Sequence, residues 1–276
     1  MHRLKYSWFF ILWFLFSCRE QSARVQETET TSELSISISQ TEKIPVTYFA
    51  PAGKIRGEVL VLPGWSYNRK RWLNETRLKE YARKNNFTLV CPEMGKTLYE
   101  SEFFPETKLK WATVPGRKFI SDYLLVQLKQ KGIFTGDVPL YILGLSTGAR
   151  GSVAIAIDHP LKFKAIAALS GDYDQSQMPK DRLMTSVYGS IEEFPERWKN
   201  RDNLALNAEK LNTPLYLGHG SQDYIVPVEQ SRLMRKILLQ KKPDLDVKFS
   251  EKEAKHDFPY WDSELNNVFE FFNKYR

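Results

Sequence analysis

The chain has 276 residues, of which 42% are apolar and 13% aromatic, and its formal net charge is +7. These values suit one globular domain with a substantial core and exclude a disordered chain, while two cysteines are too few for a disulfide-stapled scaffold. The sequence contains no zinc-ligand cluster and no sustained basic-aromatic stripe, so we expect no metal site and no nucleic-acid partner.

The first residues are predicted to direct export. Arg3 and Lys5 form a basic start, and residues 8–16 are an unbroken apolar run. Nine apolar residues are too few to span a bilayer, and this arrangement is typical of a signal peptide. We therefore assign residues 1–17 to a signal peptide.

The end of this segment, Leu-Phe-Ser-Cys at residues 15–18, resembles a bacterial lipobox, in which the cysteine becomes the lipidated first residue of the mature chain. The resemblance implies that Cys18 is lipidated and holds the protein in the bacterial cell envelope. Arg19, which stands where an aspartate would indicate inner-membrane retention, favours the outer membrane or its periplasmic face. Residues 18–33 are polar and suit a flexible tether. The alternatives are an ordinary cleaved signal and an uncleaved anchor.

From residue 34 onward, strand-like and helix-like segments alternate. This alternation predicts an α/β domain over residues 34–276, with a mostly parallel eight-stranded sheet and helices on both faces. The predicted strands lie near residues 34–39, 44–50, 57–63, 87–92, 138–144, 163–169, 213–218 and 246–250. The predicted helices lie near residues 72–85, 117–131, 147–158, 227–241 and 261–274.

Two local features in the first half of this domain need an interpretation. Arg69-Lys70-Arg71 is a dense basic run, which is either a solvated helix start or a site that captures an anionic substrate or a lipid headgroup. Cys91 ends the apolar strand at 87–91, so we expect a buried small hydrophobic side chain rather than a nucleophile.

Residues 140–151 contain a possible nucleophile. They read Leu-Tyr-Ile-Leu-Gly-Leu-Ser-Thr-Gly-Ala-Arg-Gly, an apolar strand that ends in Gly-x-Ser-x-Gly and continues as a helix. In this context the turn exposes the hydroxyl of Ser146 above the sheet. Taken alone, the motif is better explained by a turn with a serine cap, so the interpretation depends on an acid and a histidine further along the chain.

Both residues follow in the chain. Asp223 lies in a glycine-rich loop after the predicted strand at 213–218, and His256 lies between the last predicted strand and the last helix. All three residues therefore fall at the carboxyl edge of the sheet, where open α/β folds place their sites. A serine hydroxyl needs a base to attack an ester, so His256 is the candidate base and Asp223 its orienting acid.

Five segments of the chain are similar to the α/β-hydrolase superfamily, and within it to the esterase D branch, which includes S-formylglutathione hydrolases and feruloyl and acetyl esterases. The order Ser146, Asp223, His256 is the order of that superfamily. The similar segments are Val-Leu-Val-Leu-Pro-Gly-Trp at 59–65, Gly-Leu-Ser-Thr-Gly at 144–148, Ala-Ala-Leu-Ser-Gly-Asp-Tyr at 167–173, His-Gly-Ser-Gln-Asp at 219–223 and Lys-His-Asp-Phe at 255–258.

The resemblance also implies an oxyanion hole made of two backbone N–H groups. Thr147, just after the nucleophile, supplies one donor in this fold. The other is expected from the loop after residues 59–62, with Trp65 as the first choice and Ser66 or Tyr67 as alternatives. Pro63 has no N–H to donate.

Several neighbouring residues compete for roles in the site. Asp172 is the main rival to Asp223, because some hydrolases take the acid from the earlier strand, whereas Asp257 is adjacent to His256 and poorly placed. Arg150 is expected to form an ion pair that supports the turn, with contact to a substrate carboxylate as the alternative. The aromatic side chains of residues 93–116 and of a small integrated cap at 172–203 either line a pocket or pack the cap onto the body.

We therefore expect a serine hydrolase that cleaves carboxylic esters through an acyl-enzyme, without a cofactor. The expected partners are a small-molecule ester and, through the lipid anchor, a membrane. A peptidase or a thioesterase of the same fold stays open as an alternative. A non-catalytic surface-binding lipoprotein that keeps the scaffold is the alternative from another class.

Overall fold

The computed structural model describes residues 25–107 and 109–276. The predicted signal peptide at 1–17 and Cys18 lie outside this range. Among the described residues no helix is both long enough and apolar enough to cross a membrane.

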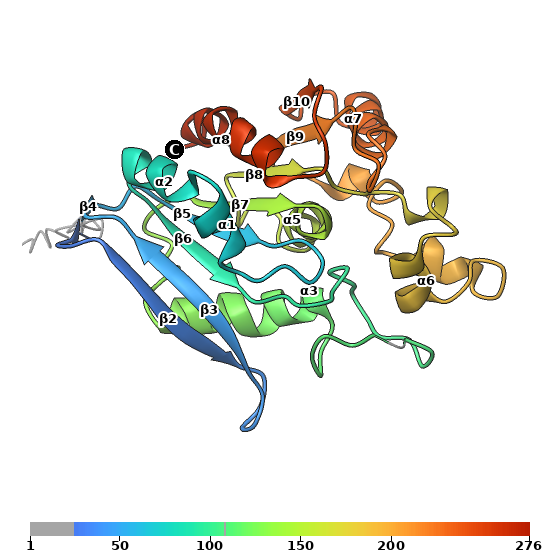
Figure 1. The fold of residues 1–276 in the computed structure, drawn as a ribbon, viewed down its shortest axis with the longest axis horizontal. Helices are drawn as coiled ribbons and strands as arrows, with labels where there is room; N and C mark the ends of the chain where they lie inside the picture. The colour runs from blue at the N-terminus through green and yellow to red at the C-terminus, as the bar shows by residue number, and fades with distance from the viewer. Residues whose placement is uncertain (1–24, 108) are drawn as a thin grey trace, which may run out of the picture.

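A central eight-stranded sheet carries the domain, as predicted (Figure 1). The strand order is β10-β9-β8-β7-β5-β6-β3-β2. The strands from β10 to β6 run parallel, while β3 and β2 pair antiparallel at one edge. The bounds are β2 (Thr30–Ser37), β3 (Lys43–Ala50), β5 (Gly57–Leu62), β6 (Phe87–Pro92), β7 (Leu140–Leu145), β8 (Ala165–Leu169), β9 (Leu215–Gly220) and β10 (Val247–Lys252). A separate two-stranded ladder joins β1 (Val25–Gln26) to β4 (Gly53–Lys54).

Helices cover both faces of this sheet because its central strands are fully buried and apolar on each side. On β5, Leu60 and Leu62 enter one core cluster, and Val59 and Val61 enter the other. The first cluster includes residues of η1 (Phe119–Leu124), α4 (Leu125–Gln130), α5 (Thr147–Asp158) and α7 (Glu229–Lys241). The second includes residues of α1 (Arg71–Glu75), α2 (Leu78–Asn85) and α8 (Phe258–Asn273).

The predicted boundary between the tether and the domain, at residues 33 and 34, is wrong. Residues 25–26 and 30–37 form β1 and β2, so chain assigned to the tether at 18–33 is in part ordered strand. Strand β2 is an edge strand whose side chains alternate between half-buried and exposed, which explains why its composition resembles a polar linker. The domain therefore begins at or before Val25.

Two predicted helices differ from the structure in detail. The helix expected at 72–85 is two helices, because the chain extends at Thr76 between α1 and α2. The last helix begins at Phe258, where the Asp257 carboxylate accepts a hydrogen bond from the Tyr260 backbone N–H. The helix predicted near 117–131 coincides with α3 (Gly116–Lys118), η1 and α4 in direct succession. Short elements that periodicity did not indicate are α6 (Arg182–Tyr188), η2 (Gln175–Gln177), η3 (Pro195–Trp198) and η4 (Ala208–Lys210).

Candidate active site

The turn between β7 and α5 holds Ser146 in a strained conformation. Its backbone has φ 53° and ψ −125°, a region that non-glycine residues rarely occupy, and its N–H donates to the Leu169 carbonyl at 2.8 Å. This hydrogen bond to β8 holds the turn in place. The turn therefore has the strand-to-helix geometry that presents a serine at the carboxyl edge of the sheet.

Close approach of the backbone explains the two glycines around Ser146. A Cβ on Gly144 would lie 2.0 Å from the Gly148 carbonyl oxygen, and a Cβ on Gly148 would lie 2.4 Å from the Leu62 carbonyl oxygen. Real Cβ contacts are never this short, so α5 packs against β5 and β7 only with glycine at both positions.

The loops after β9 and β10 bring Asp223 and His256 together. His256 Nδ1 lies 2.6 Å from Asp223 Oδ2, and the Asp223 side chain is fully buried. The other carboxylate oxygen accepts the backbone N–H groups of Ile225 and Val226 at 2.9 and 2.8 Å. Burial opposes ionisation of Asp223, but hydrogen bonds from His219 and His256 outweigh it and hold the pKa of this carboxyl well below its usual range. Asp223 is thus a permanent anion that accepts a hydrogen bond from His256.

His219 also contacts the Asp223 carboxylate, a role that the sequence did not indicate. Its ring is fully buried, with Nδ1 2.7 Å from Ser231 Oγ and Nε2 2.9 Å from the Val226 carbonyl oxygen and 3.3 Å from Asp223 Oδ2. The Val226 carbonyl can only accept, so Nε2 carries the proton and points toward the carboxylate. The sequence signal was the spacing of four residues within His-Gly-Ser-Gln-Asp, which places His219 at the end of the strand that leads to Asp223.

The rival acid Asp172 has a different partner. Arg150 Nη1 lies 2.6 Å from Asp172 Oδ2, and both side chains are almost completely buried. Arg150 also donates to Gln175 Oε1 at 3.1 Å and to the carbonyl oxygen of Asp202. Arg150 is therefore used to join α5 to the cap, and Asp172 neutralises it.

Among the three N–H groups proposed as the second oxyanion donor, those of Ser66 and Tyr67 already have acceptors. Ser66 N donates to the Gly95 carbonyl at 2.7 Å, and Tyr67 N donates to the Gly64 carbonyl at 3.1 Å. Within residues 25–107 and 109–276, the Trp65 N–H has no acceptor, and neither has the N–H of Thr147 in the first turn of α5. This distribution favours Trp65 and Thr147 over the two alternatives in the loop.

The Trp65 loop lies directly against the nucleophile. A Cβ on Gly64 would lie 3.1 Å from Ser146 Cβ and 3.3 Å from the Tyr67 ring. The loop is held in place from the side of residues 93–116, where the Tyr99 hydroxyl donates to the Pro63 carbonyl at 2.8 Å. Its position next to Ser146 is therefore fixed by packing and by hydrogen bonds.

The ring of His256 packs against Trp261 at the same end of the sheet. The two rings meet edge to face with centroids 5.1 Å apart, and Trp261 Nε1 donates to Ser170 Oγ at 3.1 Å. Ser170 follows Leu169, which holds the Ser146 backbone. Among the described residues the Ser146 hydroxyl has no hydrogen-bond partner.

Two further sequence features have structural explanations. Each cation of the run 69–71 has an acidic partner: Arg69 with Glu33 and Glu93, Lys70 with Glu33, and Arg71 with Glu75. The run is thus an ion-paired helix start. Cys91 is a buried free thiol, and burial raises its pKa far above the ordinary value, which excludes it as a nucleophile.

The aromatic side chains of the two long segments pack on one another beside Trp65. Trp198, Tyr188 and Leu98 form a small buried cluster with Met184 and Val187. The half-buried side chains of Trp65, Phe104, Leu183 and Ile191 lie against it. The cap at 172–203 is therefore integrated into the body through this cluster, which the Trp65 side chain of the loop after β5 also contacts.

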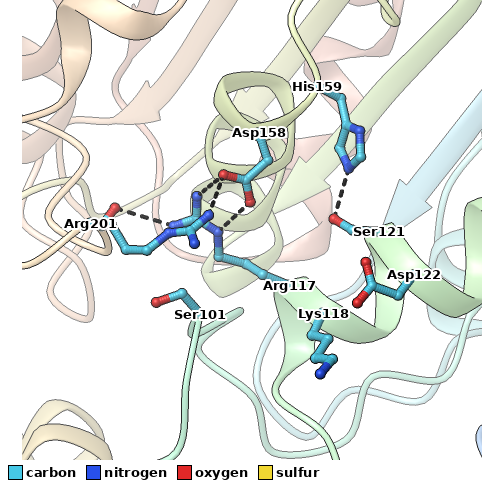
Figure 2. Close-up of a pocket in the computed structure, with 8 residues that line it drawn as sticks. All are labelled: Ser101, Arg117, Lys118, Ser121, Asp122, Asp158, His159 and Arg201. Carbon is cyan, nitrogen blue, oxygen red and sulfur yellow. Dashed lines mark hydrogen bonds and ion pairs between the residues drawn. The ribbon is translucent and has the colours of Figure 1, made fainter.

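A charged pocket of about 350 Å³ lies at the other end of α5 and contains none of the candidate triad residues (Figure 2). Arg117 and Arg201 both pair with Asp158 there, at 2.5 and 2.7 Å, and His159 Nε2 lies 2.8 Å from Ser121 Oγ. Both arginines of the pocket are thus engaged by Asp158, and Ser121 lies inside the π-helical turn η1 rather than at a strained turn. This second Ser–His pair therefore lacks the features found around Ser146.

Comparisons with known proteins identify several relatives. The family model described as "Prolyl oligopeptidase family" matches residues 75–275. An acetyl esterase of Caldicellulosiruptor saccharolyticus is 24% identical over 232 residues, which cover 78% of this chain and 82% of that protein.

Solved structures similar to this chain share its fold. An S-formylglutathione hydrolase of Agrobacterium tumefaciens is 14% identical with a TM-score of 0.70, covering 92% of this chain and 98% of that one. A ferulic acid esterase is 16% identical with a TM-score of 0.67, covering 90% and 99%. A fluorophosphonate-binding serine hydrolase of Staphylococcus aureus is 17% identical with a TM-score of 0.66, covering 88% and 98%.

Proposed function

The chain belongs to the prolyl oligopeptidase family of α/β hydrolases, and on this premise we propose that it hydrolyses carboxylic esters with Ser146, His256 and Asp223 as its catalytic triad. The observation that carries the proposal is the pairing of His256 with the buried anion Asp223 at 2.6 Å, above a sheet edge that also presents a strained serine. Esters are favoured over peptides because the similar proteins are described as acetyl esterase, ferulic acid esterase and S-formylglutathione hydrolase.

In the proposed first step, His256 takes the proton of the Ser146 hydroxyl while the serine oxygen attacks the ester carbonyl. Asp223 holds the ring with its Nδ1–H toward the carboxylate, so that Nε2 is the basic nitrogen, and stabilises the imidazolium that forms. The backbone N–H groups of Trp65 and Thr147 stabilise the oxyanion. The protonated His256 then donates to the departing alcohol, and water, activated by the same histidine, releases the acid from Ser146.

The alternative acid and the alternative oxyanion donors have less support. Asp172 is engaged by Arg150, and the N–H groups of Ser66 and Tyr67 already have acceptors. The Trp65 N–H has no acceptor among the described residues, and the preceding Gly64 lies against the Ser146 side chain, which supports the role of Trp65.

The direct test is Ser146→Ala with p-nitrophenyl acetate and p-nitrophenyl butyrate as substrates. We expect the turnover number to fall by about 10⁴-fold or more, because the acyl-enzyme no longer forms, while the circular dichroism spectrum is unchanged. The matched control is Ser121→Ala, which removes the hydroxyl of the other Ser–His pair and should leave turnover intact. Equal activity of Ser146→Ala and the parent protein would refute the proposal.

Labelling with a fluorophosphonate probe separates this enzyme from a non-catalytic binding protein on the same scaffold. The probe should label the parent protein and the Ser121→Ala variant but not Ser146→Ala. A folded parent protein that takes no label would favour the binding protein. A prolyl p-nitroanilide substrate in the same series tests the peptidase alternative.

We also propose that Cys18 carries a lipid that anchors the domain in the bacterial cell envelope. The proposal is supported by the lipobox-like residues 15–18 and the basic and apolar residues before them. Labelled palmitate should be incorporated into the full chain and lost in Cys18→Ala. Equal labelling of both chains would contradict the anchor.

A further inference from the structure

The amino edge of the sheet, opposite to the candidate active site, carries a cluster of exposed cations. Lys54 and Arg56 precede β5, Lys162 and Lys164 precede β8, and Lys129 and Lys131 end α4. The cluster is completed by Arg276 at the C-terminus. Throughout residues 25–107 and 109–276, none of these seven side chains forms an ion pair, whereas nearby Arg83 and Lys274 are paired with Glu29 and Asp246.

These cations are close enough to repel one another. Burial and the charge of Lys129 lower the pKa of Lys162, and burial and the charge of Arg56 lower the pKa of Arg276. Lys129, Lys162 and Lys164 together line a depression of about 450 Å³. Its lining sets these three lysines against two carboxylates, the buried Glu58 and the exposed Asp137, so the formal charge of the depression is positive by one. Such crowding favours an anionic partner.

An exposed leucine stands in the middle of this basic surface. Leu161 also lines the depression, and 82% of its surface is exposed. Its backbone has φ 70°, a left-handed conformation that costs a branched apolar residue free energy and that glycine adopts freely. The turn therefore exposes a leucine to solvent at a position where glycine would relieve backbone strain and stabilise the fold.

We propose that this surface, formed by the seven cations and Leu161 and called here the amino-edge surface, docks on the face of a membrane that contains anionic phospholipid. The cations contact the headgroups, and Leu161 inserts below them, since exposed apolar side chains framed by lysine and arginine are typical of interfacial binding. The candidate active site then faces away from the bilayer, because Ser146 follows the opposite end of β7.

The N-terminus of the described chain lies at the same edge and supports a membrane as the partner. Val25 pairs with Lys54 in the short ladder of β1 and β4, and 67% of its surface is exposed. Cys18 precedes Val25 by seven residues, and a segment of that length reaches at most about 25 Å when fully extended. A lipid on Cys18, as proposed above, would therefore keep the amino-edge surface next to the bilayer.

The test uses a chain that begins at Glu20, because the apolar run at 8–16 would bind any vesicle. This chain keeps the whole described fold, since the residues of both large core clusters lie between Ile36 and Phe272. Binding is measured by co-sedimentation with phosphatidylcholine vesicles, with and without phosphatidylglycerol. We expect binding only with phosphatidylglycerol, and we expect it to weaken as salt is added.

Two variants locate the binding surface. The double variant Lys162→Glu with Lys164→Glu should weaken vesicle binding by about fivefold or more for each position. Its control, Lys180→Glu with Lys199→Glu on the cap, makes the same charge change and should have little effect. Leu161→Gly should weaken binding severalfold while the thermal unfolding midpoint stays equal or rises, because glycine relieves the left-handed backbone. Leu206→Gly, at another exposed leucine, is its control.

The proposal is overturned if both vesicle types bind equally, if the two double variants weaken binding equally, or if Leu161→Gly loses stability and binds as well as the parent chain. Because the readout is vesicle binding, its failure is independent of ester hydrolysis. The circular dichroism spectrum of each sample checks that the variant is folded.

Discussion

At the scale of single residues, two buried aspartates near the nucleophile have different partners. Substitution of one should reduce turnover, and substitution of the other should reduce stability. Asp223 accepts a hydrogen bond from His256, so Asp223→Asn should leave the protein folded but allow the wrong tautomer of the histidine. We expect the turnover number for p-nitrophenyl acetate to fall by about 10⁴-fold. The thermal unfolding midpoint should change little by comparison.

Asp172→Asn should act mainly on stability. It leaves Arg150, which is 1% exposed, as a buried cation without its neutralising carboxylate. Removing one partner of a buried ion pair costs about 3 kcal/mol or more, which urea unfolding would register. If Asp172→Asn abolished turnover without loss of stability while Asp223→Asn stayed active, the assignment of the acid would have to be reversed.

The order of the three residues along the chain and their positions after strands could be predicted from the sequence. The sequence also favoured Asp223 over Asp172 as the acid and predicted an ion pair for Arg150, but it could not name Asp172 as the partner of Arg150, because that pairing depends on where the side chains lie in space. The same holds for Trp65: only the hydrogen bonds of Ser66 and Tyr67 distinguish its N–H from theirs. The roles of these residues in catalysis stay predictions until they are measured.

At the scale of elements, the packing of α5 on β5 depends on Gly148. In Gly148→Ala the new methyl group would lie 2.4 Å from the Leu62 carbonyl oxygen and 2.6 Å from that of Pro63, and both are backbone atoms that cannot rotate away. The helix must shift, so we expect a loss of about 1–3 kcal/mol in urea unfolding. Turnover should also fall, because Ser146 and Thr147 move with the helix.

The matched control for this change is Gly136→Ala. A Cβ on Gly136 would meet no atom of the described residues within 4 Å, but the backbone there has φ +87°, so alanine costs only backbone strain of about 1 kcal/mol. Turnover of Gly136→Ala should equal that of the parent protein. A fully active Gly148→Ala would contradict the close packing of this turn.

The five central strands β5 to β9 were predictable because each is fully buried, is largely apolar and ends at or near a glycine or proline. Strand β2 was predicted only from residue 34 because its first half, Thr-Thr-Ser-Glu, has the polar composition of a linker. Short helices such as α6 escaped prediction since seven residues carry too little periodicity. Their stability comes from tertiary contacts that only the fold supplies.

At the scale of the whole molecule, the two ends of the parallel strands have different chemistry. The carboxyl edge carries the strained serine, the acid–histidine pair and the cap. The amino edge carries the unpaired cations, Leu161 and the start of the described chain at Val25. If the amino-edge surface docks on a membrane as proposed, this polarity directs the candidate active site toward soluble substrate.

Ion pairs hold the edge strand β2 to the rest of the domain, and they make the stability of the fold depend on pH. Glu33 on β2 pairs with Arg69 at 2.9 Å and Lys70 at 2.8 Å, and its carboxylate accepts the Thr47 hydroxyl from β3. Burial is the largest single influence and opposes ionisation, but the hydrogen bonds from Lys70, Arg69 and Thr47 together outweigh it and lower the pKa of Glu33 from 4.5 to about 2. A carboxyl with a lowered pKa stabilises the fold above its unfolded-state pKa and loses that contribution as the pH falls.

We therefore expect Glu33→Gln to reduce the free energy of unfolding at pH 7 and to have no effect near pH 2, with the difference disappearing between pH 4.5 and pH 2. Because the Glu33 side chain is 46% exposed, solvent screens the pair and the loss should be at most about 1 kcal/mol. Urea unfolding of both chains across this range measures it. Glu192→Gln on the cap, where the exposed glutamate has no ion pair among the described residues, should show no such pH-dependent difference. A Glu33→Gln effect that persisted unchanged at pH 2 would mean that packing, rather than charge, holds β2 at the edge of the sheet.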